Sequence, residues 1–227
     1  IGGLKDGVHP KIRNCVVRYG TGNIAEGPAM TREECVQAIL TGVDTVRDLK
    51  AEGYDLIVTG EMGIGNTTTS SACAAVLFDQ APEVVTGRGA GLSTEGLNKK
   101  VRAIERAIEV NHPDKTDAID VISKVGGLDI AGMVGCYLGA AYYHLPILID
   151  GFISAISAYL AGMLSKTAKE YMIPTHGSAE PAAKLAMEHL GMQAPIQAGM
   201  HLGEGTGAIM GLSLIDQGLN VYYHVAT

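Results

Sequence analysis

The sequence has 227 residues and a formal net charge of −7, with 47% hydrophobic and 18% charged residues. This is an ordinary globular composition with enough chain for a sizeable core, and the lack of any basic run argues against a nucleic-acid partner. No apolar stretch is long and uninterrupted enough to span a bilayer, so we expect no membrane partner.

Strands and helices alternate along the predicted structure. Thr31 followed by Glu34 is a capping box that begins a helix over 31–52, which Gly53 ends. The next expected elements are a strand at 55–59, a helix at 70–76, Val84-Val85 leading into a glycine loop, a helix from 93 to about 110 and a helix opened by Gly126-Gly127. After them we expect a strand at 146–151, a helix at 153–164, a strand at 171–174, a helix with Pro181 near its start and a closing helix to about 219. This alternation predicts an α/β fold with a largely parallel sheet, in which ligands bind beyond the carboxyl ends of the strands.

Glycine is unusually frequent, with 30 residues, roughly twice the usual share. The first glycine-rich loop, residues 60–68, follows a strand and precedes a helix, so its amides and the helix N-terminus could hold an anion. It contains no Gly-Lys-Ser/Thr, which excludes a Walker loop. A tight turn is the structural alternative, but Glu61 inside the loop favours function. The candidate binding residues of this loop are Gly63, Gly65, Asn66, Thr67 and Thr68.

A second loop begins with Gly87, Arg88 and Gly89. It resembles half of a dinucleotide fingerprint but lacks the acidic residue expected ~20 positions later at a strand end. Arg88 and Lys100 could neutralise a phosphate. For Lys100 alone, a position on a solvated helix face is the commoner interpretation.

Asp150 and Gly151 end the strongest apolar strand. A carboxylate there often accepts hydrogen bonds from ribose hydroxyls. Phosphoribosyltransferases that use a pyrophosphate donor commonly place two adjacent acids after such a strand. The single acid therefore favours a donor without pyrophosphate and a mechanism without an obligatory metal. Ser178, at the start of a later helix, could bind a ligand or cap the helix, and capping is the commoner role.

Glu204 stands between Gly203 and Gly205. Flanking glycines leave a carboxylate open to a bound molecule, where it can act as a general base. The structural alternative is a charge that stabilises the helix N-terminus. No GxSxG motif is present, which disfavours a Ser-His-Asp hydrolase.

Four widely spaced cysteines form no CxxC pair, which favours reduced thiols and a cytoplasmic protein. The seven histidines form no HxxxH or HxH pair. We therefore expect no metal site, and no cofactor is implied.

Together, these motifs resemble the nicotinate-nucleotide:dimethylbenzimidazole phosphoribosyltransferase family of cobalamin assembly. The matching stretches occur in the family's order over nearly the whole chain, and the ordered set is far more specific than any single motif. They are residues 22–31 (GNIAEGPAMT), 60–68 (GEMGIGNTT), 87–93 (GRGAGLS), Gly126-Gly127 with 129–133 (DIAGM), 149–153 (IDGFI), 178–180 (SAE) and 202–208 (LGEGTGA).

The resemblance implies a Rossmann-like three-layer α/β core with part of a smaller helical domain, in a homodimer. Glu204 matches the catalytic base and Glu61 an acid in the same pocket. Leu202 and Gly203 belong to the base's motif and are expected at the substrate. The residues expected around the nucleotide are Gly63 to Thr68, Gly87 to Gly89, Lys100, Asp150, Gly151 and Ser178.

We expect residues 1–227 to form one phosphoribosyltransferase domain without the family's N-terminal helical region. Residues 1–30 and 200–227 are expected to contribute to the smaller domain. The implied reaction moves phosphoribose from nicotinate mononucleotide to 5,6-dimethylbenzimidazole or a related base. Relatives that act on phenol or p-cresol, sometimes as paired subunits, supply one alternative. A non-catalytic nucleotide-binding partner subunit of a heterodimer is the other.

Overall fold

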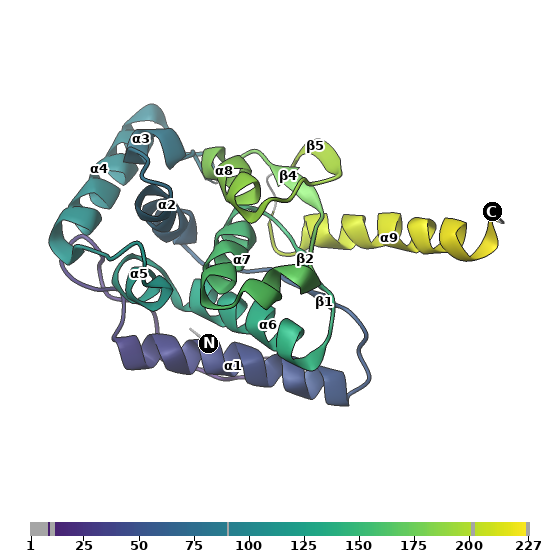
Figure 1. The fold of residues 1–227 in the computed structure, drawn as a ribbon. Coiled ribbons are helices and arrows are strands. Elements are labelled where there is room, and N and C mark those ends of the chain that lie inside the picture. The colour runs from purple at the N-terminus through teal and green to yellow at the C-terminus, as the bar shows by residue number, and fades with distance from the viewer. Residues whose placement is uncertain (1–8, 10–11, 90, 201–202, 226–227) are drawn as a thin grey trace.

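The computed structural model describes residues 9, 12–89, 91–200 and 203–225. Figure 1 shows the fold, and its elements follow in chain order. They are α1 (Arg32–Ala51), β1 (Ile57–Val58), α2 (Asn66–Leu77), α3 (Pro82–Val85), α4 (Thr94–Asn111), α5 (Ala118–Val125), α6 (Leu128–Tyr143), β2 (Ile147–Ile149), α7 (Phe152–Leu164), the 3-10 helix η1 (Lys166–Tyr171), β3 (Met172–Pro174), β4 (His176–Ser178), α8 (Pro181–Leu190), β5 (Ile196–Met200) and α9 (Thr206–His224).

Two small parallel sheets organise the Rossmann-like α/β fold. The first has the order β1-β2-β3, with Ile57 opposite Ile147 and Leu148 opposite Ile173. The second pairs β4 with β5. The parallel pairing that the alternating elements predict is confirmed, and all three residues of β2 are buried. Strands that are buried on both faces are the ones that appear as continuous apolar runs.

Helices α1 and α6 pack with their backbones in close contact. Gly42 of α1 and Gly135 of α6 face each other, and a Cβ atom on either would overlap backbone atoms of the other helix. In Figure 1, α1 therefore lies directly along α6, and α7 follows on the other side. The high glycine content is used here for helix packing as well as for loops.

Several boundaries differ from those expected. The segment with Val84 and Val85, expected to lead into a glycine loop as a strand does, is the short helix α3, because Pro82 at its first turn fixes a helical backbone angle. Helix α2 begins at Asn66 instead of Ser70, and α9 continues to His224. The structure also contains α5, η1, β4 and β5, which the sequence pattern did not predict.

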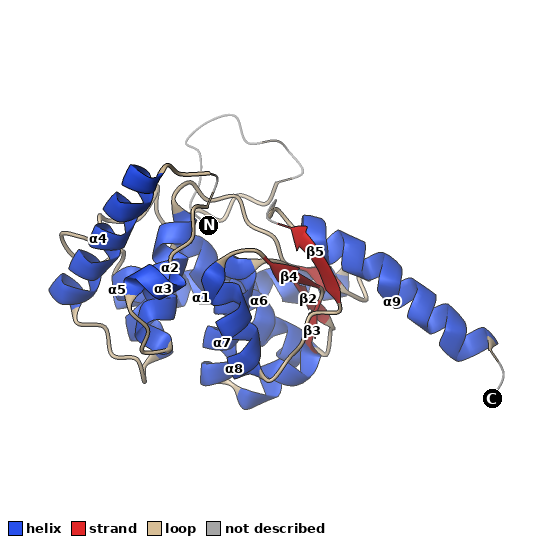
Figure 2. Cartoon of the chain, turned by 90° about the horizontal axis from the view of Figure 1, so that it is seen from above, coloured by secondary structure: helices blue, strands red, loops and turns tan. Residues whose placement is uncertain are grey.

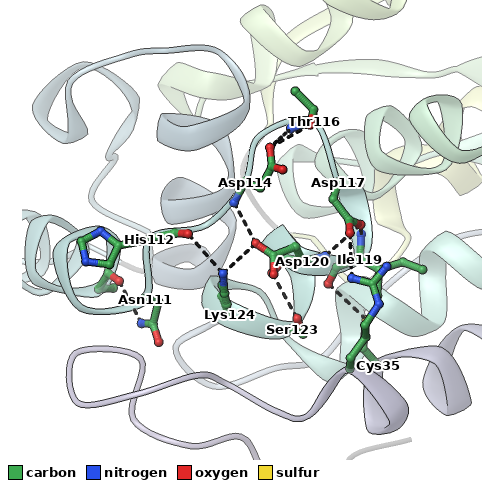
Figure 3. Close-up of polar contacts among 12 residues, drawn as sticks. Cys35, Asn111, His112, Asp114, Thr116, Asp117, Ile119, Asp120, Ser123 and Lys124 are labelled. Carbon is green, nitrogen blue, oxygen red and sulfur yellow. Dashed lines mark hydrogen bonds and ion pairs between the residues drawn. The ribbon is translucent and has the colours of Figure 1, made fainter.

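Helix α5 begins at a cap made by Asp117. Its Oδ1 accepts hydrogen bonds from the amides of Ile119 and Asp120, at 3.0 and 3.2 Å, and its Oδ2 pairs with Arg32 of α1. Lys124 then bridges Asp120 and the carbonyl of His112, which ends α4 (Figure 3). These contacts join α1, α4 and α5 at one corner of the molecule.

Helix α9 extends away from the rest of the described chain in both views (Figures 1 and 2). Its exposed side chains include several large apolar ones: Ile209, Met210, Leu214, Leu219, Val221, Tyr222 and Tyr223. Among the helices described, none is long and apolar enough to cross a bilayer.

Candidate active site

The loops that follow β1, β2 and β3 meet beyond the carboxyl ends of these strands, where parallel sheets bind ligands. With the segment before α9, they enclose a cavity of about 250 Å³. The sequence-predicted site residues that line it are Glu61, Gly63, Asn66, Thr67, Gly89, Asp150, Gly151, Ser178, Gly203 and Glu204. Motifs that are far apart in the sequence therefore converge on one place.

The remaining predicted residues stand outside this lining. They are Gly65, Thr68, Gly87, Arg88 and Lys100. The Arg88 side chain is exposed and donates to the carbonyl of Leu92 and to Oγ1 of Thr94, so it is engaged along its own loop. Leu202 lies outside the described residues.

The cavity also contains residues that were not among the predicted site residues. They are Gly60, Met62, Phe152, Ile153, Ser154, His176 and Glu180. Most of them lie inside the stretches that carry the family resemblance, which is the signal that could have found them. Ser154 and His176 lie outside those stretches, at positions that helix and strand packing explain equally well.

Glu204 lies on the rim of the cavity with its side chain exposed. Its backbone is in the left-handed region, at φ 61°, between Gly203 and Gly205 at 76° and 83°. A non-glycine residue in this conformation costs on the order of 1 kcal/mol and persists only where its surroundings hold it. The two glycines allow this turn, which leaves Glu204 exposed just before the start of α9.

Glu61 lies half-buried across the cavity mouth. Its Oε2 accepts hydrogen bonds from the amide of Gly63, at 3.2 Å, and from the side chain of Asn66. Asn66 also donates to Oδ2 of Asp129, at 2.8 Å. Burial raises the pKa of Glu61, and the nearby Asp129 and Asp150 carboxylates add to this, while the hydrogen bonds from Asn66 and Gly63 oppose it. Glu61 is therefore a carboxylate poised to hold or exchange a proton.

A neighbouring cleft of about 430 Å³ shares Glu61, Met62 and Glu204 with the cavity. It adds the apolar side chains of Val58 and Ile209. Both carboxylates thus stand where the cavity and the cleft meet. The apolar side chains of this cleft offer a packing surface for a flat aromatic molecule, beside the two carboxylates.

Lys100 reaches the start of α2 from helix α4. It is only 6% exposed, and its Nζ donates to Oγ1 of Thr67 and to the carbonyl of Gly87, both at 3.0 Å. Burial lowers the pKa of Lys100, and the charge of Glu180 opposes this shift. The ammonium group stands behind the Thr67 hydroxyl, at a helix N-terminus that already favours anions.

Glu180 and Ser178 complete the wall near Gly89. Oε1 of Glu180 accepts the Gly89 amide at 3.0 Å, and Oγ of Ser178 accepts the Glu180 amide at 3.3 Å. A side chain at Gly87 would overlap the Glu180 carboxylate. Glu180 therefore holds the second glycine loop in place.

Asp150 is buried beneath the cavity. Its carboxylate accepts hydrogen bonds from the amides of Gly205 and Ala208, at 3.1 and 3.0 Å, and Nδ1 of His176 is 3.9 Å from its Oδ1. The acid expected at the ribose is thus engaged with the first turn of α9.

Comparisons with known proteins agree with this arrangement. A family model described as "Phosphoribosyltransferase" matches residues 2–227. A nicotinate-nucleotide–dimethylbenzimidazole phosphoribosyltransferase of Acetivibrio thermocellus is 51% identical over 93% of this chain and 60% of its own length. One of Ruminiclostridium cellulolyticum is 48% identical over 96% of this chain and 62% of its own. The chain therefore spans about 60% of the length of these relatives.

The crystal structure of CobT from Thermus thermophilus matches with a TM-score of 0.89 at 36% identity, covering 97% of this chain and 66% of that one. The fold, the ordered motifs and the family model point the same way. The chain belongs to the nicotinate-nucleotide–dimethylbenzimidazole phosphoribosyltransferase family.

Proposed function

We propose that this protein transfers the phosphoribosyl group of nicotinate mononucleotide to 5,6-dimethylbenzimidazole or a related aromatic base, giving an α-ribotide and nicotinate. The observation that carries this proposal is the position of Glu61 and Glu204 where the cavity and the neighbouring cleft meet. The names of the relatives support the same substrates.

The chemistry follows from the donor. Nicotinate mononucleotide carries a positively charged pyridinium on C1′ of the ribose, which is already a good leaving group. A ring nitrogen of the acceptor attacks C1′ as the bond to the pyridinium nitrogen breaks, and the bonding electrons go to nicotinate. Attack opposite the leaving group inverts the β-linkage to α. Glu204 takes the proton from the acceptor's ring N–H, as a general base.

The donor's phosphate suits the start of α2. The helix N-terminus and the Thr67 hydroxyl lie at this end of the cavity together with Gly89, and Lys100 supplies a positive charge behind Thr67. The remaining nucleotide-binding residues in the proposal are Gly63, Gly65, Asn66, Thr68, Gly87, Arg88, Gly151, Ser178, Leu202 and Gly203. Asp150, which the sequence also placed at the nucleotide, has both carboxylate oxygens engaged with the first turn of α9. Holding donor and acceptor together supplies several kcal/mol of the acceleration.

The acceptor suits the cleft, where it can pack against the apolar side chains of Val58, Met62 and Ile209. A phenolic oxygen also needs to lose a proton, so phenol and p-cresol remain alternative acceptors for the same base. The test is the release of nicotinate, measured by chromatography, with dimethylbenzimidazole, adenine, phenol or p-cresol. Release that depends on one acceptor, with a matching ribotide, supports the transferase. No release with any acceptor from folded protein favours a non-catalytic partner subunit.

We also propose a homodimer, with α9 and residues near 1–30 contributing to a smaller domain. The exposed apolar side chains of α9, which projects from the fold, support an interface on this helix. Light scattering after size exclusion distinguishes a homodimer from a monomer that awaits a different subunit. A cytoplasmic location is supported by the four cysteines, which are all free thiols.

A further inference from the structure

Asp150 is anchored in the protein core through its backbone. It follows β2, is 5% exposed, and its amide donates to Oγ of Ser154 at 3.1 Å. That hydroxyl contacts Oγ1 of Thr59, at 2.5 Å, and the hydroxyl of Tyr137, at 2.6 Å. All of these groups are buried, so Asp150 has a fixed position from which its carboxylate can hold other groups.

The carboxylate of Asp150 caps a helix that begins much later in the chain. Helix α9 starts at Thr206, and its N-cap residue, Gly205, has no side chain to satisfy the first amides. Oδ2 of Asp150 accepts from the amide of Gly205 and Oδ1 from the amide of Ala208. A negative charge at a helix N-terminus with two amide hydrogen bonds stabilises the first turn strongly.

The first turn of α9 is also in contact with His176, whose Nδ1 is 3.9 Å from Oδ1 of Asp150. The His176 ring packs against Gly207 so closely that a Cβ atom there would overlap it. Glu204 lies one residue before the capped Gly205, in the left-handed conformation described above. The backbone position of Glu204 is therefore set by the contacts of the turn that follows it.

We propose that Asp150 is a positioning residue, which fixes the first turn of α9 and thereby aims the Glu204 carboxylate at the acceptor. This inference rests on the proposed function, in which Glu204 is the general base. In this role Asp150 acts on the reaction through Glu204, and it does not contact the ribose directly. Displacement of a catalytic group by ~1 Å can lower the rate on the order of a hundredfold.

The variant Asp150→Asn tests the proposal with little change of shape. Asparagine keeps one acceptor oxygen, but its amino group would face one of the two backbone amides, donor against donor. We expect the amides of Gly205 and Ala208 to exchange with solvent roughly tenfold faster in this variant, because a hydrogen bond to a charged group is lost. Exchange is read by NMR or mass spectrometry. Asp216→Asn, an exposed acid on the same helix, is the matched control and should leave it unchanged.

A double-mutant cycle separates positioning from direct binding. In nicotinate release, Asp150→Asn should lower kcat on the order of a hundredfold, with KM for nicotinate mononucleotide nearly unchanged. In a Glu204→Gln background the same substitution should have little further effect, because the base that it positions is already gone. If Asp150→Asn does not fold, Asp150→Glu takes its place, since it keeps the charge and both acceptors but moves them by one methylene group.

Two results would overturn the proposal. Unchanged exchange at Gly205 and Ala208 would mean that Asp150 does not hold the turn. The second result has two parts: the losses in kcat of the two single variants multiply in the double variant, and Asp150→Asn raises KM for nicotinate mononucleotide but not for a deoxyribose analogue. That result would place Asp150 at the ribose instead. If the proposed function is wrong, the wild-type protein will release no nicotinate with any acceptor. In that case amide exchange at Gly205 and Ala208 still tests whether Asp150 holds the turn.

Discussion

Gly60 lies directly against Gly205, so the two loops that carry the acidic residues touch through their backbones. A Cβ atom on Gly60 would be 2.8 Å from the nitrogen of Gly205 and 2.9 Å from the carbonyl carbon of Glu204. Gly60 precedes Glu61 in the chain. The glycine therefore lets the loops of Glu61 and Glu204 approach each other.

Substitution of Gly60 by alanine should force these two loops apart. Neither contacted atom belongs to a flexible side chain, so we expect a loss of about 1–3 kcal/mol in the free energy of unfolding and a lower kcat. Gly27→Ala is the matched control, because a Cβ atom there meets nothing within 4 Å. Urea unfolding and nicotinate release measure the two effects. Equal behaviour of the two variants would mean that the close contact has no consequence.

Removal of the proposed base should affect turnover and leave donor binding intact. Glu204→Gln keeps the size of the side chain but removes its basicity, so we expect kcat to fall about a hundredfold or more. The exposed carboxylate makes few contacts, so the melting temperature should change little. The affinity for nicotinate mononucleotide, measured by calorimetry, should be retained. Turnover close to that of the wild type would exclude Glu204 as the base.

Neighbouring lysines on α4 offer a matched pair for the phosphate site. Lys100 is buried beside Thr67, whereas Lys99 is exposed and pairs with Glu95. We expect Lys100→Met to raise KM for nicotinate mononucleotide roughly tenfold or more, since the positive charge behind Thr67 at the proposed phosphate site is lost. Lys99→Met should leave KM unchanged. A similar KM for the two variants would remove Lys100 from the site.

The sequence predicted well whatever depends on local patterns. The capping box of Thr31 and Glu34 marks the start of α1, and Gly53 follows its end, as expected. The glycine-rich motifs converge as predicted because the carboxyl ends of parallel strands share one edge. Helix α5 was missed, although Pro113 and the N-cap Asp117 precede it, because its eight residues are too few to show a clear helical period.

Long-range contacts are what the sequence could not supply. Lys100 occupies a charged amphipathic helix, where local pattern favours a solvated position, and only the packing of α4 against the start of α2 buries it. Asp150 was expected at a ribose, but its partners are backbone amides, which carry no sequence signal. His176 and Gly207 likewise come together only in the folded chain.

Burial of Glu61 has a consequence for stability. Its pKa is raised above the ordinary value of 4.5, so the folded protein binds this proton more readily than the unfolded chain. The protonated Glu61 therefore adds to the stability of the folded protein below the unfolded pKa, and this added stability is lost as the pH rises through the folded pKa. Glu61→Gln removes this titration, so the stability of the variant relative to the wild type should increase as the pH rises above 4.5, until Glu61 is ionised in the folded wild type. Urea unfolding at each pH measures this.

The control for that series is Glu105→Gln, which changes an exposed acid on α4. Its stability difference from the wild type should vary much less with pH. A difference for Glu61→Gln that stays constant over the same range would contradict a raised pKa at Glu61.

The side chain of Asp117 makes two kinds of contact, a cap on the backbone of α5 and an ion pair, and two variants can distinguish their contributions to stability. Oδ1 of Asp117 holds the amides of Ile119 and Asp120, while Oδ2 pairs with Arg32. Asp117→Ala removes both and should lower the free energy of unfolding by about 1 kcal/mol, whereas Asp117→Asn keeps a good cap and should lose much less. Thermal unfolding of the two variants measures the difference. Equal losses would mean that the exposed ion pair with Arg32, and not the cap, stabilises this corner of the fold.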